Sequence, residues 1–525
     1  MTRRVKTKGQ RGNPARWFRR VLFTLLPLTF HLVGCAKAPV AITPAHPSDP
    51  LAKLATDITS TIRTPGVARG IWGVSVYSLD RRESLFALND RTLLVPASTA
   101  KLIALGAAAQ AVGWDYEYET VVRATGPIVD GVVQGDLVVV GSGDPSIGGR
   151  GGGSLAPFVN VMRTAGIRRV DGRVIGDDDA LEEPRPQLAW AWDDLGYTTG
   201  ALFGALNYGE NRMDVIVGPG HAVGAPSTLT QPYSWSRPMV NRAMTGAADS
   251  AQLLWPEQRP GEPFLTIAGS LPIGAPPARL SVSVGNPTLW FANALRQALI
   301  EAGIDVRGEA QDVDDVVLEP LEPERGDGIL YIHRSPPLAA LARPMLKDSV
   351  NLYGEAALRL NTPGGAFPTN DAALAGLRTT LASWDVPTDG WQVVDGSGLS
   401  RRDAIAPDTL IAVLRRMWDP TGASPWMNSL PIAGVDGTLA GRMVGTAAAG
   451  NVRAKTGTMS NIRALAGYVR TKDGDTLAFA VIVNNFEGPG AAAVDAIDRI
   501  AVTLADFSRV PGVPGVPGVP EVPAP

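Results

Sequence analysis

Apolar residues recur at helical spacing near both ends of the chain, with short strand-like runs beside them. Stripes spaced three and four residues apart predict helices at Leu51, Leu54, Ile58 and Ile62, and at Val494, Ile497, Ile500, Ala501 and Leu504. Runs at 73–79 and 84–87, and at 464–469 and 477–483, predict strands, and Lys472-Asp-Gly-Asp475 predicts a hairpin turn between the last two. We expect helices and antiparallel strands from both chain ends to form one α/β domain.

Basic residues and a short apolar run give the amino end the character of an export signal. Residues 1–34 hold eight of the 48 Lys and Arg and no acid, and the run Val21–Phe30 is too short for a stable membrane span. Leu32-Val-Gly-Cys35 follows and is similar to a bacterial lipobox, whose cysteine carries diacylglycerol. We expect an exported lipoprotein, periplasmic or on the cell surface, anchored to a membrane through Cys35. A chance lone cysteine is the alternative.

Charge, cysteine and histidine content narrow the function classes. Cys35 is the only cysteine, so no internal disulfide is possible. Without residues 1–34 the chain keeps 40 basic and all 51 acidic residues, a net charge of −11, which argues against nucleic acid as a partner. His46, His221 and His333 show no metal-ligand spacing. With no Gly-x-Ser-x-Gly either, we expect no metal, no cofactor and no Ser-His-Asp hydrolase.

Three short motifs follow one another in a fixed order along the chain. They are Ser98-Thr-Ala-Lys101, Ser349-Val-Asn351 and Lys455-Thr-Gly457-Thr458. Together they offer a nucleophile, a lysine base, a second Ser/Asn pair and a cationic strand, the set that serine β-lactamases and penicillin-binding proteins use for acyl transfer. Each alone is weak evidence, whereas all three in this order are strong evidence.

The first motif lies at the start of a predicted helix. Residues 96–113 are rich in Ala and Leu, begin at a proline and end at a glycine. Ser98 therefore falls in the first turn, where free N–H groups favour negative charge, and Lys101 lies one turn along on the same face. The alternative is a helix cap at Ser98 with Lys101 exposed on the surface.

Lys101 can act as a base only when its amine is neutral. Bringing a lysine pKa from about 10.4 to about 7 takes roughly 4–5 kcal/mol, which we expect burial and the second cation Lys455 to supply. Residues 451–459 read as a strand, in which Gly457 would allow a substrate backbone to approach. Thr456 and Thr458, beside Lys455, suit a carboxylate. The alternative is an ordinary edge strand with a solvated lysine.

The middle motif is the weakest of the three. The Ser349 hydroxyl can relay a proton and the Asn351 amide can bind a substrate amide. Turn or cap chemistry would also explain these two residues.

With these motifs the chain resembles a known family, the class C low-molecular-mass penicillin-binding proteins. These are D-alanyl-D-alanine carboxypeptidase/endopeptidases of the penicillin-binding protein 4 type, serine peptidase family S13. The resemblance runs from about Leu51 to about Arg509, and Val350 departs from it, since the family usually has a polar residue there. Besides the motifs, four stretches carry it: Gly135–Pro145, Asp395–Arg401, Leu430–Thr438 and Ala454–Thr458.

The resemblance implies an architecture. It assigns residues 51–115 and 320–509 to a β-lactamase/transpeptidase-like catalytic domain, an antiparallel sheet with helices, and 116–319 to inserted strand-rich domains between the first and second motifs. A hairpin turn predicted at Asp130-Gly131 and the lack of long helical periodicity there agree. The Pro- and Gly-rich stretches 216–237 and 256–278 predict loops or domain joints. Residues 1–34 form the signal, 35–50 a linker, and 510–525 a disordered Val-Pro-Gly tail.

The resemblance also implies a reaction. Ser98 attacks the penultimate D-Ala carbonyl of a peptidoglycan stem peptide, Lys101 accepts its proton, and the N–H groups of Ser98 and Thr458 form the oxyanion hole. Ser349 protonates the leaving D-Ala, and Lys455 with its threonines binds the terminal carboxylate. β-Lactam antibiotics would acylate the same serine.

One further residue enters through the inserted region. The string 172–181 resembles the place where family members direct an acid toward the cleft, and Asp177 is the candidate for binding a free amine on the stem peptide. A solvated acidic loop is the alternative.

Two other functions use the same fold. A serine β-lactamase would share the trio, but its motifs normally lie closer together, and rapid penicillin turnover would identify it. A catalytically idle wall-binding scaffold is the second, and the intact Ser98, Lys101 and Lys455 speak against it.

Overall fold

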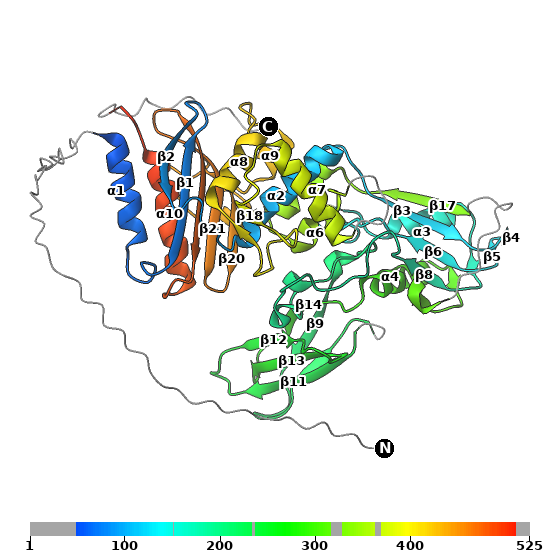
Figure 1. Cartoon of the computed structure of the whole chain (residues 1–525). Coiled ribbons are helices and arrows are strands. Elements are labelled where there is room, and N and C mark those ends of the chain that lie inside the picture. Colours follow the sequence, from blue (N-terminus) through cyan, green and yellow to red (C-terminus); the bar gives the residue numbers. More distant parts are fainter. Residues whose placement is uncertain (1–48, 151, 234–236, 317–327, 363–368, 511–525) are drawn as a thin grey trace, which may run out of the picture. The chain divides into compact units, whose positions relative to one another are not determined.

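The computed structural model describes residues 49–150, 152–233, 237–316, 328–362 and 369–510 (Figure 1). The predicted signal, the lipobox at Cys35 and nearly all of the Val-Pro-Gly tail lie outside these ranges. Within them, no helix combines the length and the apolar character needed to span a membrane.

A five-stranded antiparallel sheet joins the two chain ends. Its order is β2-β1-β22-β21-β20. The predicted strands and hairpin are confirmed: β1 is Ile71–Ser78, β2 Glu83–Leu88, β20 Arg453–Met459, β21 Ile462–Arg470 and β22 Thr476–Asn484. Because β1 pairs with β22 along its whole length, with Val76 opposite Phe479, the first and last strands form one sheet.

Helices from the chain ends cover one face of this sheet (Figure 1). They are α1, Pro50–Ile62, and α10, Gly490–Asp506, as the apolar stripes predict. The Asp49 carboxylate caps α1 by accepting from the Leu51 N–H at 3.0 Å. Ile58 and Ile500 are buried between the helices and the sheet.

A second group of helices packs in the core on the other face. They are α2 Ala100–Val112, α5 Leu338–Leu346, α6 Asn351–Arg359, α7 Asn370–Ser383, α8 Pro407–Met417 and α9 Pro425–Ser429, with the short strands β18 Trp391–Gln392 and β19 Ala404–Ile405. Along β21, Ala464 and Ala466 face this core while Leu465 faces the α1/α10 core. Ala478 and Ala480 of β22 lie on the same face. Small side chains therefore line the sheet face on which helix α8 packs.

Between the first and second motifs the chain forms two sheets around one core. The first has the order β16-β8-β6-β3-β17 and the second β15-β7-β5-β4. Their strands are β3 Glu119–Ala124, β4 Ile128–Val129, β5 Val132–Val133, β6 Leu137–Val140, β7 Arg169–Val170, β8 Val174–Asp177, β15 Asp305–Val306, β16 Ala310–Asp312 and β17 Ile329–Arg334. Helices α3, Ala156–Thr164, and α4, Pro287–Glu301, pack in this core. The hairpin turn at Asp130-Gly131 is confirmed, with φ of 48° and 73°.

Two further three-stranded sheets share a smaller core. Their orders are β10-β9-β14 and β11-β13-β12, and β11 runs parallel to β13. The strands are β9 Arg212–Gly218, β10 Thr228–Thr230, β11 Met239–Gly246, β12 Leu253–Glu257, β13 Leu265–Pro272 and β14 Ala278–Ser283.

Three sequence-based expectations for the inserted region need correction. The boundary at 319 falls too early, because β17 pairs with β3 and carries the inserted sheet on to Arg334. A long helix is present, since α4 buries Trp290, Phe291, Leu295 and Leu299 at helical spacing. The stretches 216–237 and 256–278 are not only loops: they contain β10 and β13, whose pairing offsets their high Pro and Gly content.

Candidate active site

All three motifs meet at one cavity of about 330 Å³. Ser98, Ser349, Asn351, Thr456 and Thr458 line it, and the two motif lysines lie beneath them, with no exposed surface. Segments 398–401 and 458–460 complete the wall from the catalytic side. The inserted region contributes to the lining too, through Asp194 and Thr199.

A strained turn presents the nucleophile. Residues Ala97–Thr99 form a single 3₁₀ turn before α2, so Ser98 precedes the α-helix by two residues. Ala97 is buried with φ of 47°, a conformation that side-chain-bearing residues seldom adopt. Lys101 Nζ lies 2.9 Å from Ser98 Oγ. The predicted one-turn contact forms, and the surface-lysine alternative is excluded because Lys101 is fully buried.

Two more acceptors fix the Lys101 amine. Its Nζ donates to Asn351 Oδ1 at 2.6 Å and to the Ser397 carbonyl at 2.6 Å. Burial lowers the pKa of Lys101 to about 7, although the carboxylates of Asp395, Glu355 and Asp403 act in the opposite direction. The amine is therefore held beside Ser98 in a form that is neutral in a large share of molecules at neutral pH.

Two buried carboxylates shape the loop that supplies the Ser397 carbonyl. Glu355 Oε1 accepts the N–H groups of Gly396, at 3.1 Å, and Ser397, at 2.9 Å. Asp395 accepts those of Gly398, at 2.6 Å, and Ser400, at 2.7 Å. This loop lies within Asp395–Arg401, for which the motif analysis gave no role. Its run of small polar residues and glycine after an aspartate is the signal that marks such a backbone-binding turn.

Gly398 is required where it stands. Its φ is 78°, and a Cβ there would lie 2.0 Å from the Ala97 carbonyl oxygen. The loop therefore packs directly on the turn that presents Ser98, which leaves space only for glycine.

The second and third motifs meet through Lys455. Its Nζ donates to Ser349 Oγ at 2.8 Å and to the Thr456 carbonyl at 2.8 Å. Burial first, and then the charge of Lys101, lower the pKa of Lys455 well below its ordinary value. The expectation that Lys455 lowers the pKa of Lys101 therefore needs correction. Burial does this, and Lys455 is not among the groups that shift the pKa of Lys101.

Strand β20 lies at the edge of its sheet, as the strand reading predicts. Thr456 Oγ1 donates to Thr438 Oγ1 at 2.8 Å, so the Leu430–Thr438 stretch also reaches the cavity. A Cβ on Gly457 would lie 2.6 Å from the Pro96 carbonyl oxygen. The glycine is thus needed for close packing of β20 on the nucleophile turn, whereas the sequence argument assigned it to substrate approach.

The structure does not bring Asp177 to the cavity. This residue ends β8, is absent from the lining, and accepts a hydrogen bond from the nearby Asp179 N–H at 3.2 Å. The acids in the lining are Asp194 and Asp348, and Asp348 pairs with Arg150 at 3.6 Å. Burial raises the pKa of Asp194, while the charge of Arg401, also in the lining, lowers it. Sequence reasoning missed Asp194 because no motif surrounds it.

Among the described residues, one cluster of three acidic side chains has the spacing of a cation site. Asp179, Glu183 and Asp314 bring carboxylate oxygens within 4.8 Å of one another, and all three side chains are exposed. The group lies outside the cavity lining, and nothing in the chemistry of the cavity calls for a metal.

Comparison with known proteins identifies the family. A model described as the D-Ala-D-Ala carboxypeptidase 3 (S13) family matches residues 54–506. The chain belongs to this family. A D-alanyl-D-alanine carboxypeptidase of Actinomadura sp. strain R39 is 34% identical over 524 residues, covering 96% of this chain and 93% of the relative. The D-alanyl-D-alanine carboxypeptidase DacB of Haemophilus influenzae is 26% identical over 79% of this chain and 85% of its own length.

Solved structures show the same fold. Penicillin binding protein 4 from Haemophilus influenzae matches with a TM-score of 0.74 at 23% identity, over 87% of this chain and 99% of its own. The same protein complexed with a novel β-lactam matches with a TM-score of 0.69 over 85% of this chain. The expected transpeptidase-like α/β fold with an insert is confirmed for this S13 member.

The lowered pKa of Lys101 gives a pH prediction. Only the neutral amine takes a proton from Ser98, so the second-order rate of Ser98 acylation by a fluorescent penicillin should rise about tenfold per pH unit below 7 and level off above it. Asp395→Asn removes a charge that raises this pKa and should move the midpoint to lower pH. A wild-type midpoint near 10 would contradict the role given to burial.

Proposed function

We propose that this chain is a serine-type D-Ala-D-Ala carboxypeptidase that works through an acyl-enzyme on Ser98 and also opens peptidoglycan cross-links as an endopeptidase. The observation that carries the proposal is the contact between Ser98 Oγ and a fully buried Lys101 amine, beside an edge strand that bears Lys455. The relative that is 34% identical over nearly the whole chain bears the name of this activity.

Acylation uses the Ser98–Lys101 pair. Neutral Lys101 takes the Ser98 proton as Oγ attacks the carbonyl carbon of the penultimate D-Ala. Asn351 and the Ser397 carbonyl keep the amine in place while its charge develops. The backbone N–H groups of Ser98 and Thr458 would stabilise the oxyanion, each donor contributing roughly 3–4 kcal/mol.

The second motif protonates the leaving group. Ser349 Oγ, hydrogen-bonded to Lys455 Nζ, passes a proton to the amine of the terminal D-Ala as the peptide bond breaks. The proton that Lys101 took from Ser98 replaces the one that Ser349 gave up, so Lys101 is neutral again. Water then attacks the ester carbonyl, Lys101 accepts its proton, and that proton passes to Ser98 Oγ as the ester bond breaks. The substrate carboxylate, placed by Thr456 and Thr458, favours the charged form of Lys455, and the resulting ion pair helps to hold the substrate.

Peptidoglycan stem peptides and β-lactams are the proposed ligands. β20 is the edge strand of its sheet among the described residues. Beyond Ala454, whose N–H donates to the Pro431 carbonyl, its outer side would let a peptide add as an extended strand in front of Ser98. β-Lactams mimic the D-Ala-D-Ala terminus and acylate the same oxygen. The site argues against the two competing functions. A β-lactamase does not require cavity walls contributed by the insert. A catalytically idle scaffold does not require a buried lysine beside the serine.

Besides Asp348, which pairs with Arg150, the cavity offers the Asp194 carboxylate and the Arg401 guanidinium, a set that suits a zwitterionic side chain. Asp194 is half-buried and Arg401 is near enough to influence its pKa. We assign to Asp194 the amine-binding role that the sequence argument gave to Asp177.

For localisation we keep the lipoprotein hypothesis. A lipidated Cys35 would anchor the chain, and three acyl chains hold a protein to a bilayer far more firmly than one. The 14 residues between Cys35 and Pro50 would connect that anchor to α1.

Replacing the nucleophile tests the function directly. Ser98→Ala should abolish both the release of D-Ala from purified muropeptides and covalent penicillin labelling, with the melting temperature unchanged, because no acyl-enzyme can form. Mass spectrometry of the wild-type digest separates loss of one D-Ala from opening of cross-links. Penicillin label persisting on another peptide of the variant would place the nucleophile elsewhere.

A matched pair of substitutions tests the amine site. Asp194→Asn should raise KM for amine-bearing muropeptides about fivefold, since a partly exposed charge pair contributes about 1 kcal/mol, while sparing the rate of acylation by small β-lactams. Asp177→Asn, outside the cavity, should change neither quantity. The reverse outcome would restore the original assignment to Asp177.

Cys35→Ala tests the anchor. The variant should stay uncleaved or partition into the aqueous phase of a detergent extraction, because it cannot receive lipid. Wild type should partition into detergent. Equal partitioning of the two proteins would refute the lipobox hypothesis.

A further inference from the structure

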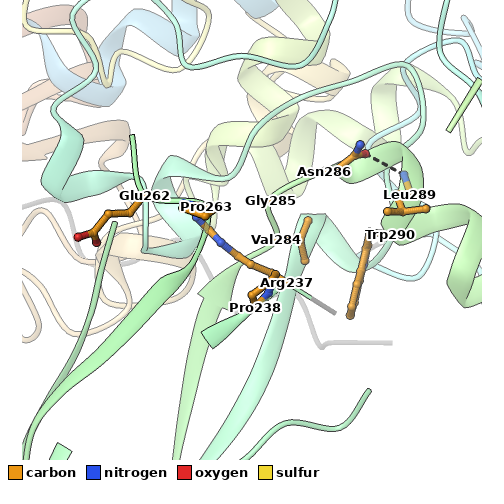
Figure 2. A pocket seen from close by; sticks show the side chains of 9 residues that line it. All are labelled: Arg237, Pro238, Glu262, Pro263, Val284, Gly285, Asn286, Leu289 and Trp290. Atoms are coloured by element: carbon orange, nitrogen blue, oxygen red, sulfur yellow. Dashed lines mark hydrogen bonds between the residues drawn. The ribbon is translucent and has the colours of Figure 1, made fainter. Parts of the chain in front are cut away.

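A second cavity, of about 390 Å³, lies in the inserted region (Figure 2). It is bounded by the residues just before β11, the segment before β13, the residues just after β14 and the first turn of α4. It shares no lining residue with the catalytic cavity. Its walls are mostly apolar and carry one guanidinium, and the residues that matter here are Arg237, Pro238, Glu262, Val284, Leu289 and Trp290.

The Arg237 guanidinium has no anionic partner in the part of the chain that the structure describes. The side chain lies along Gly285, where an added Cβ would be 3.6 Å from both Arg237 Cδ and Nε. Burial alone lowers the pKa of Arg237 to about 10, and no carboxylate raises it. Glu262 also lines the cavity, but Figure 2 shows its carboxylate turned away from the guanidinium. Arg237 is half-buried, and a charge removed in part from water gains from a counter-ion, so this cation favours an anion from outside.

The surroundings favour an anion that carries apolar groups. Val284, Leu289 and the Trp290 ring supply apolar surface, and the Trp290 indole N–H is already used by the Tyr208 carbonyl at 3.0 Å. The Asn286 side chain is also occupied, because its Oδ1 caps α4 at the Leu289 N–H (2.8 Å) and its Nδ2 donates to Asp312 (2.7 Å). The positive end of the 15-residue helix α4 adds to the potential of Arg237.

We propose that this cavity is a second, non-catalytic site for the carboxylate end of a stem peptide. The guanidinium would take the terminal carboxylate through two parallel hydrogen bonds, and the apolar walls would take the alanine methyl groups. A cavity of this volume holds a ligand of dipeptide size, whereas a strongly hydrated phosphate gains nothing from apolar walls. The site would keep the enzyme on cross-linked wall while the catalytic cavity acts on a neighbouring peptide. This inference rests on the proposed function for its ligand.

The test measures binding with the catalytic cavity blocked. Wild-type protein is first acylated with penicillin G, and Nα-acetyl-D-Ala-D-Ala is then titrated by calorimetry. We expect the acylated wild-type protein to bind this peptide. The Kd should be at least tenfold higher for the C-terminal amide of the same peptide, and at least tenfold higher when the acylated protein carries Arg237→Gln. Arg242→Gln, which removes an exposed arginine from the same strand region, should bind like wild type.

Turnover gives an independent readout. Arg237→Gln should release D-Ala from the soluble peptide at the wild-type rate, because Arg237 is absent from the catalytic cavity, and should digest insoluble cross-linked peptidoglycan several-fold more slowly. Its melting temperature should equal that of Arg242→Gln, which separates loss of binding from loss of fold.

Three outcomes overturn the proposal: no binding to acylated wild type, equal binding by Arg237→Gln, or displacement of the peptide by an equal concentration of inorganic phosphate, which would indicate a general anion site. Failure of the proposed function looks different, since penicillin G would then add no mass to the peptide containing Ser98. In that event Ser98→Ala replaces the acylated protein, and dependence on Arg237 still decides the question.

Discussion

The burial of the Lys101 amine is the constraint on which the rest of the site depends. A lysine without exposed surface must either find acceptors for its protons or give up its charge, because desolvation of an ammonium group is costly. Here both occur: Ser98, Asn351 and the Ser397 carbonyl surround Nζ, and its pKa falls to about 7. The same environment makes Lys101 a base at neutral pH and fixes the direction in which it receives a proton.

Carboxylates beneath the site determine how far that pKa falls. Glu355 and Asp395 bind the backbone of the loop that supplies the Ser397 carbonyl, and their charges also favour the protonated amine. Burial in turn raises the pKa of Glu355, so the burial that lowers the pKa of Lys101 also disfavours one of the charges that oppose this shift. Structural support and electrostatic tuning of the base thus come from the same two side chains.

The inserted region takes part in the catalytic centre. The Trp190 indole N–H donates to Asp395 at 2.8 Å, and Asn351 Nδ2 donates to the Thr199 carbonyl at 2.8 Å. One residue from the insert therefore contacts the acid that orders the Ser397 loop, and another orients the amide that holds Lys101. The insert contributes to the cavity wall as well, through Asp194. These contacts give a physical reason for a long insertion between two motifs that act together.

The sequence alone determined the elements near the two chain ends and the reactive set. Apolar periodicity identified α1, α10 and the strands near both chain ends, because each pattern is local and each element buries one face. The motifs identified Ser98, Lys101, Ser349 and Lys455, since the chemistry needs those residue types. Only the tertiary structure decided what surrounds them: Lys101 meets Asn351 and Ser397, 250 and 296 residues away, and Asp194 rather than Asp177 reaches the cavity. Contacts over such separations depend on how sheets and loops pack, and this packing cannot be inferred from a local sequence pattern.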